Sequence, residues 1–155
     1  MGDRTDVTLT IIKEHEELAQ PILETYGGGA EVSLDQEGLI SLFFEEVNYG
    51  ELPFLNLLEE QGIPYDSDWG DGGEYKAGYK AFRIDENGAH HFTEVSNNDT
   101  ANTIELSKLN RICESQDLTD SEKLSSIKSL MEETKEQDNP PFTLEENRAI
   151  LFDIN

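Results

Sequence analysis

The sequence predicts a single α+β domain: an antiparallel-rich sheet with helices packed on one face, followed by a helical C-terminal third. Three observations support this fold class. The chain has 155 residues, the length of one domain with one hydrophobic core. Alternating or β-branched apolar segments dominate the first two thirds, whereas apolar residues at helical spacing dominate the last third. Asn87 and Gly88 separate two apolar runs and indicate a hairpin turn, which joins antiparallel strands.

The first part of the chain is expected to alternate between strands and helices. Residues 7–12 (VTLTII) alternate and are rich in β-branched side chains, so they predict an opening strand. Residues 14–26 predict a helix that Pro21 bends or interrupts and that the glycines at 27–29 end. Residues 39–44 (LISLFF) are apolar on both faces, which is typical of a central strand.

A short helix, an acidic loop and a hairpin are expected next. Residues 51–61 form an amphipathic pattern with a proline in the first turn, which predicts a helix. The stretch 66–75 (DSDWGDGGEY) is expected to be an exposed, mobile loop, because three of its ten residues are glycine. Residues 75–84 and 89–95 predict the two strands of the hairpin.

The last third is expected to be helical. Residues 103–114 have apolar side chains at helical spacing, and Thr119 and Glu122 form a capping-box pattern that opens a further helix. We expect one domain over residues 1–137, helical from about residue 102, and a linker with a short docked tail over 138–155. The apolar end of this tail is compatible with an edge strand or with a docked helix. The apolar face of the helix after the capping box consists of Leu124, Ile127, Leu130 and Met131.

Charge restricts the possible partners. The chain has 34 acidic against 11 basic residues, a formal net charge of −23. Such a field repels nucleic acids and anionic membranes and attracts basic surfaces, so we expect neither direct nucleic-acid binding nor membrane association. From residue 14 to residue 75 there is no Lys or Arg, while 16 residues are acidic. Mixed charge is enough for solubility, so this one-sign stretch favours a basic protein partner.

The sequence predicts a cytoplasmic protein. The single cysteine, Cys113, cannot form an internal disulfide, and it has the helical spacing of a packing residue rather than of a nucleophile. Residues 1–6 are polar and lack a signal-peptide pattern. The apolar runs are all much shorter than the roughly 18 residues of a membrane span.

Catalytic and cofactor motifs are not found. No nucleophile elbow, phosphate-binding loop, zinc-protease motif or dinucleotide fingerprint occurs, so we expect no enzymatic activity and no cofactor. His90 and His91 are adjacent in a predicted strand and would point to opposite faces, which argues against a shared metal. His15 lies among glutamates and is expected to be a surface histidine with a raised pKa.

The acidic stretch 66–75 has three interpretations: a solvated turn, a weak Ca²⁺ loop or a partner-binding loop. Counted from Asp66, the fifth, sixth and twelfth positions are Gly70, Asp71 and Ala77, which do not fit the EF-hand pattern. We therefore predict no dedicated metal site. A loop that contacts a partner is the interpretation that we prefer.

Acidic and aromatic residues alternate along the cation-free stretch. Aromatic side chains supply contact area and carboxylates supply electrostatic steering, a combination suited to a protein interface. Carboxylates on a rigid surface can also imitate the phosphates of duplex DNA. Trp69 is the expected anchor, and the acidic residues expected to contact the partner are Glu45, Glu46, Glu51, Glu59, Glu60, Asp66, Asp68, Asp71 and Glu74.

Residues 45–83 (EEVNYGELPFLNLLEEQGIPYDSDWGDGGEYKAGYKAFR) resemble a stretch found in small, acidic, uncharacterised proteins of bacteria, phages and plasmids. This resemblance covers a quarter of the chain and implies a mobile-element setting, in which acidic inhibitors and DNA mimics are common. It implies no catalytic residues.

The sequence thus predicts an acidic binding protein that blocks a basic, nucleic-acid-binding surface of a partner, as a DNA mimic or inhibitor in counter-defence. The first alternative is a small adaptor or structural domain whose acidity serves solubility. The second is a weak Ca²⁺-binding protein or an enzyme with a carboxylate site. A concentrated acidic surface favours the inhibitor, whereas acids spread over all faces favour the adaptor.

Overall fold

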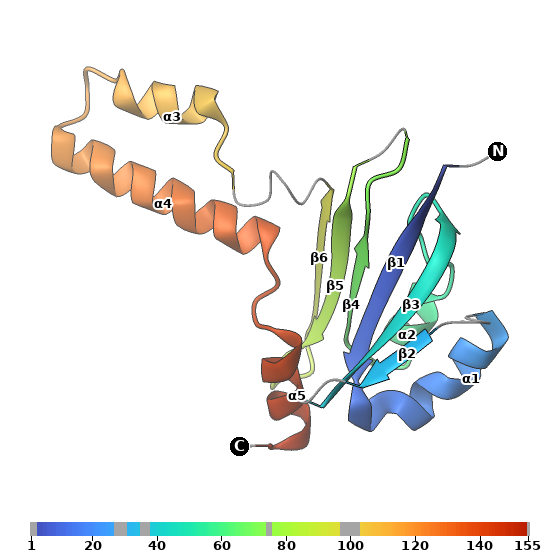
Figure 1. Cartoon of the computed structure of the whole chain (residues 1–155). Coiled ribbons are helices and arrows are strands. Elements are labelled where there is room, and N and C mark those ends of the chain that lie inside the picture. Colours follow the sequence, from blue (N-terminus) through green and yellow to red (C-terminus); the bar gives the residue numbers. More distant parts are fainter. Residues whose placement is uncertain (1–2, 27–30, 35–37, 74–75, 97–102, 155) are drawn as a thin grey trace.

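The computed structural model describes residues 3–26, 31–34, 38–73, 76–96 and 103–154. Its centre is a six-stranded sheet with the order β2-β3-β1-β4-β5-β6, in which all neighbouring strands pair antiparallel (Figure 1). The predicted α+β class with an antiparallel sheet is therefore confirmed. The strands are β1 (Arg4–Ile12), β2 (Glu31–Leu34), β3 (Leu39–Asn48), β4 (Tyr65–Trp69), β5 (Gly78–Ile84) and β6 (His90–Ser96).

The helices surround the sheet in three groups. α1 and α2 cover one face, α3 and α4 form a hairpin that extends away from β6, and α5 lies at the end of the sheet near the C-terminus (Figure 1). The prediction of a helical last third is confirmed, and the tail forms a docked helix rather than an edge strand. The helices are η1 (Lys13–His15), α1 (Glu16–Tyr26), α2 (Leu55–Glu60), α3 (Leu106–Cys113), α4 (Asp120–Asp138) and α5 (Leu144–Phe152).

The main core lies between the sheet and the pair α1 and α2. Successive side chains of a strand point to opposite faces, so Val7, Leu9 and Ile11 of β1 all point to this side and are fully buried. Apolar residues at the same level of β3, β4 and β5 continue this layer, and Ala19 and Leu58 close it from the helices. Burial of such side chains contributes about 1.5–3 kcal/mol each.

α5 packs on the opposite face of the sheet. Ile12 and Leu39 point to this side at the end of their strands, and buried Leu144 covers them. The side chain of Asn147 is fully buried and bonds both backbone groups of Ile84: its Oδ1 accepts from the amide at 3.1 Å and its Nδ2 donates to the carbonyl at 2.7 Å. The prediction that helices pack on one face of the sheet therefore holds for α1 and α2, whereas α5 packs on the other face.

Residues 66–69 contradict the expected acidic loop. They belong to β4, which lies inside the sheet between β1 and β5. Tyr65 and Ser67 are buried and Trp69 is half-buried on the core side, whereas Asp66 and Asp68 point to the other face. The alternation of aromatic or small residues with aspartates is a strand pattern, and it outweighs the acidic composition. Within the stretch 66–75, the irregular connection is limited among the described residues to 70–73.

Two segments near the chain ends are held together around His15. The Arg148 side chain in α5 pairs with Glu14, and this pairing holds the pKa of the Glu14 carboxyl below its usual range. The imidazole of His15 packs edge-on against Phe152 with ring centroids 5.1 Å apart, and its Nδ1 is buried without a hydrogen-bond partner. Burial lowers the pKa of His15, although Glu14 opposes this shift. The expected surface histidine with a raised pKa is therefore wrong, because desolvation outweighs the nearby carboxylate.

Protonation of His15 should destabilise the protein. Because folding lowers the pKa of His15, the contribution of this side chain to stability is complete above its unfolded-state pKa of 6.5. That contribution is lost as the pH falls below this pKa. Between about pH 7.5 and about pH 5.5, we expect the wild type to lose unfolding free energy relative to His15→Gln, by no more than the roughly 1.4 kcal/mol that one pH unit on either side of the unfolded-state pKa allows. Urea denaturation of both proteins at each pH measures this difference, and parallel pH profiles would contradict it.

Candidate functional site

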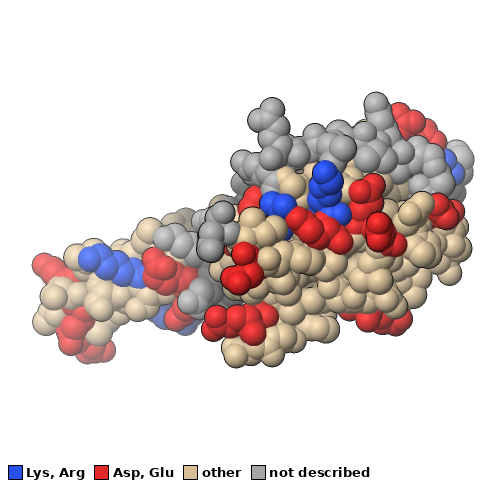
Figure 2. Space-filling model, turned by 90° about the horizontal axis from the view of Figure 1, so that it is seen from below, with Lys and Arg blue, Asp and Glu red and all other residues tan. Residues whose placement is uncertain are grey.

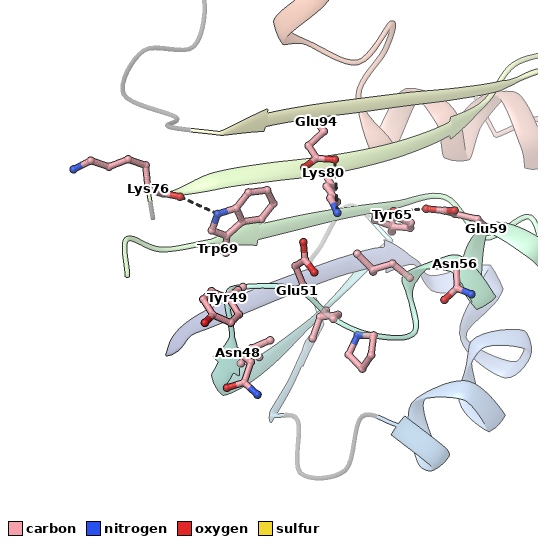
Figure 3. A pocket seen from close by; sticks show the side chains of 15 residues that line it. Asn48, Tyr49, Glu51, Asn56, Glu59, Tyr65, Trp69, Lys76, Lys80 and Glu94 are labelled. Atoms are coloured by element: carbon pink, nitrogen blue, oxygen red, sulfur yellow. Dashed lines mark hydrogen bonds and ion pairs between the residues drawn. The ribbon is translucent and has the colours of Figure 1, made fainter. Parts of the chain in front are cut away.

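A hollow of about 960 Å³ opens on the core side of the sheet, beside the end of α2 (Figure 3). It forms because the chain leaves β3 in a tight turn and crosses to α2 without covering the neighbouring part of β4 and β5. Tyr49 and Gly50 make this turn with φ values of 53° and 68°, a left-handed conformation that favours glycine. The hollow therefore lies between the 47–56 segment on one side and three consecutive strands on the other.

Trp69 forms an aromatic wall of the hollow. Its indole Nε1 donates to the carbonyl oxygen of Lys76 at 3.0 Å, which fixes the ring plane (Figure 3). The ring lies directly against Gly50 and Gly78, where an added Cβ would come within 2.7 and 2.4 Å of indole carbon atoms. The two glycines thus allow the indole to approach the backbone, and Trp69 is a positioned wall rather than a free side chain.

A second aromatic residue orients a carboxylate at the α2 end of the hollow. The buried Tyr65 hydroxyl donates to Oε1 of Glu59 at 2.7 Å. Burial raises the pKa of Tyr65 strongly, and the hydrogen bond to Glu59 raises it further. The phenol therefore remains protonated and holds the Glu59 carboxylate at the rim.

Charged side chains meet across the hollow. Lys80 and Glu94 occupy paired positions of β5 and β6, and Nζ lies 3.6 Å from Oε2. Glu51 extends from the segment before α2 toward the space between Trp69 and Lys80 (Figure 3). The carboxylates of Glu51, Glu59 and Glu94 surround the hollow together with three aromatic rings, those of Tyr49, Tyr65 and Trp69. The ammonium group of Lys80 is already paired with Glu94.

The structure brings together only part of the predicted contact set. Glu51, Glu59 and Trp69 line the hollow. The other described acids lie elsewhere, and Glu74 is outside the described residues. Glu45 and Glu46 are exposed where β3 bulges against β1, and Glu60 is exposed at the end of α2. Asp66 and Asp68 point to the opposite face of the sheet. Asp71 accepts a hydrogen bond from the Ala77 amide at 2.7 Å.

Asp66 has a structural role on the opposite face. Arg83 of β5 is 1% exposed, and its Nη2 lies 2.6 Å from Oδ1 of Asp66. The same guanidinium donates to the carbonyl oxygens of Tyr65 at 2.8 Å, Phe82 at 3.1 Å and Phe142 at 3.0 Å. A buried guanidinium without such acceptors would be strongly destabilising. Asp66 therefore serves as the counter-charge of Arg83.

Asp68 lies two residues further along the same face without a cationic partner among the described residues. Partial removal from water raises the pKa of Asp68, and the neighbouring Asp66 carboxylate raises it further. Desolvation also raises the pKa of Asp66, although Arg83 opposes this effect. Both aspartates line a shallow hollow of about 340 Å³ beside Glu145. In the described part of the chain, no three His, Cys, Asp or Glu side chains come together as possible metal ligands.

Two residues of the larger hollow, Lys80 and Glu94, were not singled out from the sequence. The predicted Asn87–Gly88 turn indicates the hairpin but not its register. Counting outward from a two-residue turn at these positions would place Lys80 opposite Val95, on a neighbouring position of β6. The structure instead pairs Lys80 with Glu94, because Glu86 also belongs to the loop and Asp85 pairs with Ala89.

No family model, no curated protein and no solved structure matches this chain. Function therefore has to be inferred from the residues and geometry of the chain itself. None of the helices within the described residues is both long enough and apolar enough to cross a membrane.

Neutralising each of the two aspartates of β4 should have a different effect on the free energy of unfolding. Asp66→Asn removes the counter-charge of a buried guanidinium and should lower the unfolding free energy by about 2 kcal/mol at neutral pH. Asp68→Asn removes a carboxylate that is repelled by Asp66, so it should leave stability unchanged or raise it slightly. Urea denaturation measures both effects, and equal destabilisation by the two variants would contradict the assigned roles.

Proposed function

We propose that the protein is an acidic binding protein that engages the basic surface of a partner protein and receives a Lys or Arg side chain in the hollow beside Trp69. The observation that supports this proposal best is the convergence of Glu51, Glu59 and Trp69, three predicted contact residues, on one concave site. The net charge of −23 supplies long-range attraction for such a partner.

The chemistry of the hollow fits a cationic side chain. A guanidinium can stack on the Trp69 indole and at the same time donate to the exposed carboxylate of Glu51. The two lysines that line the hollow do not cancel this preference, because the ammonium group of Lys80 is paired with Glu94 and the side chain of Lys76 points away from the hollow (Figure 3). A phosphate would find carboxylates around the site and few free donors, so an anionic ligand fits less well.

The nucleic-acid-binding surface of a DNA- or RNA-binding protein is the kind of partner that this proposal favours. Such surfaces concentrate Lys and Arg to neutralise phosphates, and they would be attracted by the same field that repels nucleic acid from this chain. The resemblance of residues 45–83 to small acidic proteins of mobile elements is compatible with an inhibitor that acts on a host protein. Occupation of the partner's basic surface would then exclude nucleic acid by competition.

A small adaptor domain is the second candidate, and the distribution of charge favours it. Asp66 and Asp68 lie on the face opposite the hollow, and Asp66 neutralises a buried arginine. Figure 2 shows the acidic side chains of one face in small groups with uncharged residues between them. An extended imitation of duplex DNA needs a more continuous row of carboxylates. The proposal therefore concerns a local site with general electrostatic attraction rather than a long mimic of DNA.

Trp69 provides a direct readout for the hollow, because it is the only tryptophan of the chain. Titration with a short oligoarginine peptide should change Trp69 emission, and the affinity should fall steeply as salt is added. Glu51→Gln should weaken binding about fivefold, since it removes one charge-assisted contact of roughly 1 kcal/mol.

Glu60→Gln is the matched control, because it removes the same charge from an exposed position that does not line the hollow. This control should weaken binding less than about twofold, as expected for a solvent-exposed charge that makes no contact in the hollow. Equal effects of the two substitutions, or peptide binding that leaves the Trp69 emission unchanged, would show that the hollow is not the binding site.

A further inference from the structure

The start of β6 has an aromatic surface that the helices leave exposed. Phe92 pairs with Phe82, whose side chain is fully buried in the main core, so Phe92 lies on the same side of the sheet. Phe92 itself is 61% exposed, because α1 and α2 do not extend over β6 (Figure 1). His90, two residues earlier in the strand, points to the same side and is also exposed. These two residues form the Phe92–His90 surface.

The rings of this surface are held in place by the core. The Phe92 ring stacks on the Phe82 ring, with centroids 5.0 Å apart and an angle of 19° between the planes. The His90 imidazole meets the Phe82 ring edge-on, with centroids 5.1 Å apart. Because the buried Phe82 ring supports both, an apolar side chain can bind here at little cost in ordering of the protein.

This aromatic surface continues directly into the larger hollow. Glu94 follows Phe92 by two residues on the same side of β6, and it lines the hollow. Trp69 pairs with Gly78 of β5, and Gly78 pairs with Ser96 of β6. Trp69 is therefore two strands away from Phe92 and four residues further along the strand direction. A rise of about 3.3 Å per residue and a spacing of about 4.8 Å between strands place Trp69 and Phe92 roughly 16 Å apart.

An extended segment of a partner can reach both aromatic residues. A distance of about 16 Å corresponds to four to five residues of an extended chain. Side chains of such a segment that point to the same side are an even number of residues apart. A spacing of four residues therefore puts a long cationic side chain beside Trp69 and an apolar side chain on Phe92.

Charge favours a cationic segment over a second copy of this chain as the occupant. Among the described residues, Glu51 and Glu59 of the hollow have no cationic partner. A second copy would bring a net charge of −23 toward these carboxylates. The Phe92–His90 surface alone accepts any apolar group, whereas the adjoining carboxylates select a segment that also has a cation.

We propose that the partner presents an extended segment in which a Lys or Arg side chain and a large apolar side chain are four residues apart. The cation enters the hollow beside Trp69, and the apolar side chain packs on Phe92. This inference rests on the proposed cation-binding role of the hollow and adds a sequence requirement for the partner. A segment with basic residues alone occupies the hollow and leaves the Phe92–His90 surface exposed.

Two peptides that differ at one position test this requirement. The first consists of three arginines, three serines and a leucine, so the leucine is four residues after the last arginine. The second has serine in place of leucine. Titration followed by Trp69 emission should show about tenfold tighter binding of the leucine peptide to the wild type, as expected for burial of a large part of a leucine side chain. Added salt should weaken both peptides alike, so the ratio of their affinities should stay constant.

Phe92→Gln should lower this ratio to less than about twofold and leave the affinity for the serine peptide unchanged, because it removes only the apolar contact. Phe43→Gln is the matched control, since Phe43 is also exposed but pairs with Thr8 on the opposite face of the sheet. This control should keep the wild-type ratio. Both variants should retain the circular dichroism spectrum of the wild type, because they change exposed side chains.

The outcomes separate this inference from the proposed function. Equal affinities of the two peptides for the wild type, or the same ratio in the wild type and in Phe92→Gln, would overturn the inference and leave the cation site intact. If neither peptide changes Trp69 emission, the proposed function fails, and the inference fails with it. A wild-type dimer in sedimentation equilibrium that Phe92→Gln removes would show that a second copy covers the surface, which would also overturn the inference.

Discussion

The arrangement of this domain depends on the burial of one arginine in a strongly acidic chain. Arg83 is enclosed between the sheet and the segment before α5, and its guanidinium needs acceptors from several parts of the chain. Carbonyl groups of Tyr65, Phe82 and Phe142 supply them, together with the carboxylate of Asp66. These contacts join β4, β5 and the start of α5, and they determine which face of β4 receives the aspartates.

The orientation of β4 places the aspartate that binds Arg83 on one face of the sheet and the aromatic residues of the hollow on the other. Asp66 is directed toward Arg83, so Tyr65 and Trp69 must point to the opposite face of the sheet. On that face the chain path between β3 and α2 forms the hollow. A shift of the strand by one residue would place the aspartates in the main core and the aromatic rings against Arg83. The same alternation therefore stabilises one face of the sheet and supplies an aromatic wall to the other.

The sequence specified much of the fold and less of the candidate site. The alternation in residues 7–12, the Asn87–Gly88 turn and the capping signals indicated β1, the β5–β6 hairpin and the later helices correctly. The acidic composition of residues 66–69 concealed β4, although the order Tyr65, Ser67 and Trp69 is that of an inward face. β2 was missed, because its four residues gain their strand structure from pairing with β3. The hollow depends on the path between β3 and α2, which no local pattern reveals.

Native-state hydrogen exchange provides the most direct test of the structural role assigned to Arg83. If this side chain joins α5 to the sheet, the slowest amides of Leu144–Phe152 and of β5 should open together, with the same free energy of exchange in low denaturant. An α5 helix that opens at a free energy at least about 2 kcal/mol below that of β5 would instead be an independent unit. That result would contradict the view that the buried arginine organises both faces of the sheet.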